Sequence, residues 1–302
     1  MQPLTSPRAA ARRGLLSIAL AAVLWGTIGV TTKLLYELAA TNPLSIGFFR
    51  LGLAAPLVTA AAWAHLGRHT FAIAPRDLLR VMLVGAMLAF YQVCYFAAIA
   101  QTGVILATLV TLCTAPVLVG VIGIALTRER LPRTTLLALG SALSGTALLM
   151  VGPPEAAPHS TATVAGVVLA LGSATGYAVM AVLSRALAAR YHPLQVTGLG
   201  FVAGAALLLP LALAGGLVIR YPPQGWLLLV GLGLIPTAAG HLLFQSGMRT
   251  TPATAASILT LMEPLTATIL AWILFGERLG PGGLPGALLL LGALAVLYRG
   301  AA

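Results

Sequence analysis

The sequence predicts an all-α membrane protein of ten transmembrane helices, arranged as two five-helix repeats of inverted topology. First, 59% of its 302 residues are hydrophobic and 8% are charged, whereas about a quarter of the residues of a soluble domain are charged. Second, it contains apolar runs of about 17–25 residues, enough to cross a ~30 Å hydrocarbon core as helices. Third, the tripeptide Glu-Arg-Leu occurs at Glu129–Leu131 and again at Glu277–Leu279, each time at the same distance after a proline, Pro116 or Pro264.

Glycine, proline and polar residues separate the apolar runs and divide the chain into ten crossings. The first repeat is expected over residues 15–151 after a cytoplasmic segment 1–14, and the second over 164–300 after a linker 152–163 that begins Gly-Pro-Pro. The predicted crossings are Leu15–Tyr36, Leu44–Ala64, Leu78–Ala100, Val104–Leu126, Thr134–Val151, Val164–Leu183, Leu194–Gly215, Trp226–Gly247, Ala253–Phe275 and Gly283–Tyr298.

The basic residues test this layout. If the N-terminus is cytoplasmic, most of the lysines and arginines fall on cytoplasmic segments or helix ends, and only Arg220 and Arg278 fall outside. Cytoplasmic loops carry such an excess of Lys and Arg. An odd number of crossings per repeat inserts the second copy upside down, as in many alternating-access transporters.

The motifs resemble the EamA-type ten-helix exporters of the drug/metabolite transporter superfamily. The likeness rests on Trp25-Gly26 followed by Lys33, on Pro116 to Glu129-Arg130-Leu131, and on Glu263-Pro264 to Glu277-Arg278-Leu279. Bacterial inner-membrane exporters of amino acids, including aromatic ones, are similar in length and layout. The resemblance implies a multi-pass inner-membrane exporter. In the sixth crossing Thr175-Gly176 stands where the Trp-Gly pair would be, so no role of Lys33 is transferred to Arg185.

Polar and aromatic side chains at membrane depth are the candidates for a substrate site, because they are costly there unless they face protein or water. Helices paired between inverted repeats are where a midplane site is expected, and the third and eighth crossings correspond under the repeat. For each residue a packing role is the alternative. The predicted substrate-binding residues are Trp25, Tyr91, Gln92, Tyr95, Tyr177, His241 and Gln245.

Three ionisable residues are candidates for coupling or gating: Lys33, Arg50 and Glu263. Glu263 could carry a coupling proton, bind a substrate ammonium group, or bond to neighbouring helices. Lys33 could pair with Glu37 one turn away, snorkel, or form an extracellular gate with Arg50. Proline removes a backbone donor and kinks helices, so hinges are expected at Pro116, Pro236 and Pro264.

Other classes of protein are disfavoured. The basic residues form no stripe interleaved with aromatics, so no nucleic-acid partner is expected. No nucleophile–base pair, metal-ligand cluster or catalytic motif is present, so we expect no enzyme, catalytic residue, metal or cofactor. The prediction is therefore a transporter, expected as a monomer in the lipid bilayer with both termini cytoplasmic. It would export small metabolites, amino acids above all, by alternating access, with drugs or nucleotide sugars as the alternative substrates.

Overall fold

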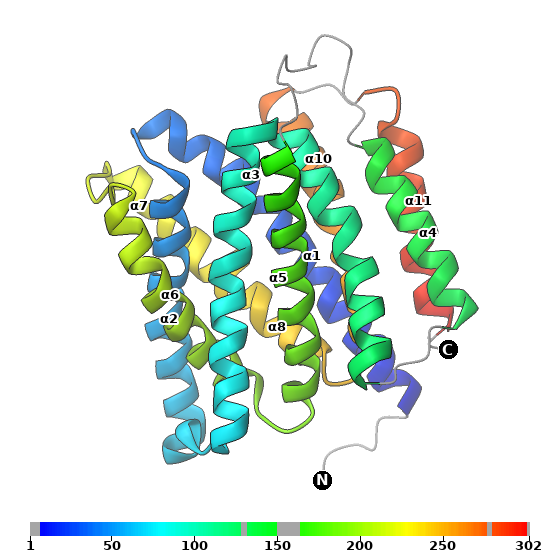
Figure 1. Ribbon diagram of the computed structural model, residues 1–302, viewed down its shortest axis with the longest axis horizontal. Helices are drawn as coiled ribbons and strands as arrows, with labels where there is room; N and C mark the ends of the chain where they lie inside the picture. The colour runs from blue at the N-terminus through cyan, green and yellow to red at the C-terminus, as the bar shows by residue number, and fades with distance from the viewer. Residues whose placement is uncertain (1–6, 128–131, 150–163, 277–279, 301–302) are drawn as a thin grey trace.

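The computed structural model describes residues 7–127, 132–149, 164–276 and 280–300, which are mostly helical and contain no strand (Figure 1). Both Glu-Arg-Leu motifs and the predicted linker lie outside these residues. The helices are α1 Pro7–Leu38, α2 Pro43–Leu66, η1 Gly67–Phe71, α3 Pro75–Ile122, η2 Gly123–Thr127, α4 Arg133–Leu149, α5 Val164–Ala188, α6 Pro193–Ala214, α7 Pro223–Leu232, η4 Gly233–Ala239, α8 Gly240–Gly247, α9 Ala253–Leu259, α10 Met262–Phe275 and α11 Gly283–Gly300.

The helices have the apolar composition that the sequence predicts. Within the described residues, eight helical segments are long and apolar enough to cross a membrane, and Val110–Ala125 forms a shorter apolar one. Proline begins α2, α3, α6 and α7, the position where its missing N–H is harmless and its fixed φ suits a helix. The all-α membrane fold is confirmed.

The third and fourth crossings differ from the prediction in one respect. They belong to one helical element, α3, which is assigned as helix through residues 101–103, where the sequence predicts a break. The Tyr95 hydroxyl nevertheless lies 2.6 Å from Thr108 Oγ1, although 13 residues of straight helix would separate them by about 20 Å. α3 therefore turns back on itself, as Figure 1 shows, and supplies both crossings.

Corresponding helices of the two repeats run in opposite directions. In Figure 1 α1 runs upward and α5 runs downward, and α2 and α6 are opposed in the same way. The first and last helices meet at one end of the bundle, where the Arg12 guanidinium lies 5.0 Å from the centre of the Tyr298 ring. The arrangement is that of two inverted five-helix repeats.

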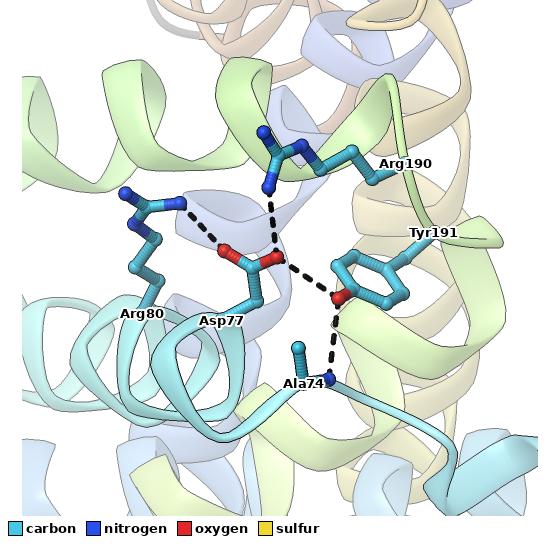
Figure 2. A network of polar contacts seen from close by, with 5 residues as sticks. All are labelled: Ala74, Asp77, Arg80, Arg190 and Tyr191. Atoms are coloured by element: carbon cyan, nitrogen blue, oxygen red, sulfur yellow. Dashed lines mark hydrogen bonds and ion pairs between the residues drawn. The ribbon is translucent and has the colours of Figure 1, made fainter.

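Polar contacts join the repeats at this end (Figure 2). Asp77, in the first turn of α3, accepts a hydrogen bond of 2.9 Å from the Tyr191 hydroxyl and forms ion pairs with Arg80 at 2.5 Å and Arg190 at 3.1 Å. The Tyr191 hydroxyl in turn accepts from the Ala74 amide. The connection between α2 and α3 is thereby fixed to that between α5 and α6.

The equivalent connections meet at the other end of the bundle. Asn42 caps α2 by accepting from the Ser45 amide at 2.8 Å, and its side-chain nitrogen donates to the Gly216 carbonyl at 2.8 Å. Thr41 Oγ1 lies 2.5 Å from the Tyr221 hydroxyl. Polar contacts therefore hold the two repeats together at both ends of the bundle.

Candidate functional site at the junction of the two repeats

The eighth crossing contains an irregular turn that positions the polar residues. It consists of α7, the π-helical η4 and α8, with Pro236 inside η4. Pro236 has no N–H to donate to the Leu232 carbonyl four residues earlier, and the Thr237 hydroxyl donates to that carbonyl instead, at 2.7 Å. π-Helical turns of this kind occur frequently at functional sites.

Thr237 forms hydrogen bonds with two ionisable side chains, those of Arg50 and His241. Arg50 of α2 donates its Nε–H to Thr237 Oγ1 at 3.2 Å. His241 Nδ1 lies 2.9 Å from the Thr237 carbonyl oxygen, and since a carbonyl only accepts, the hydrogen is on Nδ1. The imidazole is thus held in one orientation with Nε2 as its remaining polar atom.

Aromatic rings surround His241. The Trp25 ring of α1 lies 4.9 Å from the His241 ring and 5.3 Å from Phe244, and Phe201 of α6 meets His241 edge-on at 5.1 Å. A Cβ atom at Gly240 would lie 2.7 Å from Trp25 Nε1, so glycine is required for this approach. Trp25 is 6% exposed and its buried Nε1 has no hydrogen-bond partner among the described residues.

The predicted tyrosines come from α3 and α5. Tyr91 and Tyr177 meet edge-on with their ring centres 6.2 Å apart. The Tyr177 hydroxyl is 3.1 Å from Thr260 Oγ1, and the Tyr95 hydroxyl contacts Thr108. Each of the three tyrosines is half-buried.

The ninth crossing is interrupted next to these residues. α9 ends at Leu259 and α10 begins at Met262, because the Pro264 ring would clash with the carbonyl four residues earlier, that of Thr260. The Thr260 carbonyl accepts instead from the Glu263 amide at 3.0 Å. Glu263 consequently lies in the first turn of α10 and remains half-buried.

Glu263 is close enough to four other predicted site residues to interact with them electrostatically: Arg50, Tyr91, Tyr95 and Tyr177. Arg50 and the first two tyrosines belong to the first repeat, and Glu263 and Tyr177 to the second. With Trp25 and His241 they form a group of residues at the junction of the repeats, which we call the junction cluster.

Other predicted residues lie differently. The Gln245 amide donates to the Ser184 carbonyl of α5 at 3.1 Å, so it is engaged in helix packing. Gln92 donates to the Leu88 carbonyl, and its Oε1 faces Gly47 of α2 without a partner among the described residues. Lys33 is exposed near the end of α1, whereas Arg50 points toward Thr237.

The three prolines also differ from one another. Pro236 and Pro264 accompany a π-helical turn and a helix break. At Pro116 the α-helix continues, and a π-helical turn follows only at Gly123–Thr127. Sequence reasoning missed Thr237 and Thr260, whose only signal was a hydroxyl residue close to a proline inside an apolar run.

Two inverted helical repeats that share a cluster of polar residues at their junction define the class of protein as a membrane transporter of the inverted-repeat type. The EamA-like transporter family matches the chain twice, over residues 12–151 and 164–299. The protein belongs to this family of the drug/metabolite transporter superfamily.

Curated relatives extend over nearly the whole chain. The uncharacterized transporter YwfM of Bacillus subtilis (strain 168) is 32% identical over 282 residues, covering 93% of this chain and 92% of the relative. An uncharacterized transporter of Archaeoglobus fulgidus is also 32% identical, covering 95% and 97%. A crystal structure with 22% identity superimposes with a TM-score of 0.81 over 94% of this chain and 95% of its own, which shows the shared fold.

Proposed function

We propose that the protein exports amino acids across the bacterial inner membrane by alternating access, with the junction cluster as its substrate site. The transporter family supplies the class of function. The single observation that carries the finer proposal is that Tyr91 of one repeat and Tyr177 of the other lie with their ring centres 6.2 Å apart, near the charges of Arg50 and Glu263.

The cluster has groups suited to an amino acid. Arg50, Glu263 and Nε2 of His241 can bind the polar groups of the substrate. The rings of Trp25 and the tyrosines can contact an apolar or aromatic side chain. A nucleotide sugar would require several lysine or arginine side chains around its phosphates, and the junction cluster as defined above contains one, Arg50.

Movement would occur at the irregular turns that accompany the prolines. The π-helical turn at Pro236 and the break before Pro264 lie directly beside cluster residues, and Pro116 lies in the limb of α3 that follows Thr108. Rocking of the helices about these positions would open the cluster to each side in turn. The distribution of basic residues supports a cytoplasmic location of both termini.

Uptake into proteoliposomes tests this proposal. Radiolabelled amino acids and nucleotide sugars are compared with and without a pH gradient, and protein-free liposomes serve as the blank. We expect uptake of amino acids, reduced at least about tenfold by Tyr177→Ala, because this variant loses the aromatic ring that would contact the substrate side chain. Tyr36→Ala removes the same ring from an exposed residue and should transport normally.

The substrate panel separates the alternatives. Uptake of nucleotide sugars without uptake of amino acids would overturn the substrate assignment. Equal uptake by the Tyr177→Ala and Tyr36→Ala variants would argue against the junction cluster as the site.

A further inference from the structure

Arg50 is a buried cation that no carboxylate contacts within the described part of the chain. Its side chain is 6% exposed, and its Nε bonds to the neutral hydroxyl of Thr237. The terminal guanidinium nitrogens have no hydrogen-bond partner among the described residues. A buried charge is strongly unfavourable unless it is paired. This guanidinium is therefore a candidate group for binding an anion.

Glu263 is the complementary group. Its carboxylate has no hydrogen-bond donor among the described residues and is half-buried. Glu263 and Arg50 interact electrostatically, yet they are too far apart to form an ion pair in this structure. The two repeats therefore place one positive and one negative side chain near each other without direct contact.

A ligand that carries both charges satisfies both side chains at once. We propose that the site selects zwitterions, with Arg50 binding the substrate carboxylate and Glu263 binding its ammonium group. This assignment rests on the proposed function and names the recognition chemistry of the same site. A guanidinium matches the planar geometry of a carboxylate with parallel hydrogen bonds.

The assignment predicts that the site rejects molecules with one charge. A cationic amine without a carboxylate leaves Arg50 unpaired, and an acid without an amine leaves Glu263 unpaired. Arg50 is nearly fully buried whereas Glu263 is half-buried, so blocking the substrate carboxylate should weaken binding more than blocking the amine. We expect at least about 100-fold weaker binding for the first change and at least about tenfold for the second.

The test uses three forms of each substrate. The twenty standard L-amino acids are screened by thermal stabilisation of the purified full-length protein, since a ligand that binds the folded state raises its apparent stability. For those that stabilise it, dissociation constants are measured for the free amino acid, its amide and its N-acetyl derivative. The amide carries only the ammonium group, and the N-acetyl form carries only the carboxylate.

Variants connect each charge to its residue. Arg50→Gln should bind the free amino acid and the amide with similar affinity, whereas Glu263→Gln should bind the free amino acid and the N-acetyl derivative with similar affinity. Arg80→Gln removes a half-exposed arginine on α3, outside the cluster, and should keep the wild-type order of affinities. Arg50→Lys, which retains the charge, shows whether loss of binding by Arg50→Gln reflects the charge or a failure to fold.

The outcomes separate this inference from the proposed function. If free amino acids and their blocked forms bind the wild-type protein equally, the zwitterion assignment is wrong while amino-acid export stands. If neither glutamine variant changes the order of affinities, the assignment of the two residues is wrong. If no amino acid binds or is taken up, both proposals fail.

Discussion

Gly85 lies where α3 packs against Gly200, Ala203 and Gly204 of α6, so a substitution there tests this helix packing directly. The sequence of α6 contains Gly200-x-x-x-Gly204, a pattern typical of close helix packing in membranes. A Cβ atom at Gly85 would overlap the Gly200 carbonyl oxygen and lie 2.8 Å from Ala203 Cβ and 3.0 Å from the Gly204 nitrogen. We expect Gly85→Ala to destabilise the protein, because two of these three obstacles are backbone atoms that no rotamer change can move.

Gly140→Ala in α4 is the matched control, since a Cβ atom there meets nothing within 4 Å. Both variants gain the same helix propensity, about 1 kcal/mol, so their difference isolates the clash. Overpacking of this kind costs up to about 3 kcal/mol, and we expect the two unfolding free energies to differ by about that amount. The assay is equilibrium unfolding by SDS in mixed micelles, followed by tryptophan fluorescence. Equal stability of the two variants would refute the close packing of α3 on α6.

Three further perturbations test other contacts. Thr237→Val removes the hydroxyl that bonds both to Arg50 and to the Leu232 carbonyl, and should lower the unfolding free energy by about 1–3 kcal/mol; Thr237→Ser should be close to wild type. Asp77→Asn removes the ion pairs shown in Figure 2 and should cost no more than about 1 kcal/mol, because both arginines are substantially exposed; a larger loss would mean that these contacts are not screened. Burial, then His65 and Arg249, lower the pKa of His192, whose Nδ1 caps α6 by accepting from the Leu194 amide, so protonation opposes folding. Stability should therefore rise with pH through the range from the lowered pKa to about 6.5, and His192→Asn, which retains a cap, should flatten the melting-temperature profile between pH 5 and 7.

The fold was predictable because apolar runs and charge placement report directly on bilayer crossings. The predicted break at residues 101–103 was the exception: no proline lies there, so helical hydrogen bonding can continue, and glycine alone weakens a helix by only about 1 kcal/mol. The reversal of the chain between the third and fourth crossings was predicted, whereas the contact of Tyr95 with Thr108 was not, because sequence periodicity does not report side-chain contacts.

The residues of the junction cluster were predictable in part. Trp25, Arg50, Tyr91, Tyr177 and Glu263 could be selected because polar or aromatic side chains at membrane depth are few. The partners of each side chain depend on helix rotation, which hydropathy does not determine. Gln245 consequently bonds to Ser184 of the neighbouring helix.

Thr237 shows the limit of sequence reasoning most clearly. Its contact with Arg50 spans 187 positions of the chain. Its second bond exists only because Pro236 leaves the Leu232 carbonyl without a backbone donor. A Pro-Thr pair in an apolar run predicts an irregular turn, but it does not predict which distant side chain will bond to the threonine.

Accessibility of Tyr177 from the two sides of the membrane tests the central claim most directly. A cysteine at this position, with Cys94 and Cys113 replaced by serine, would be labelled by an impermeant methanethiosulfonate added to either side of oriented vesicles. The account predicts labelling from each side, slowed from both by a saturating amino acid that the protein transports. Labelling from one side only, or labelling that the amino acid does not change, would contradict it.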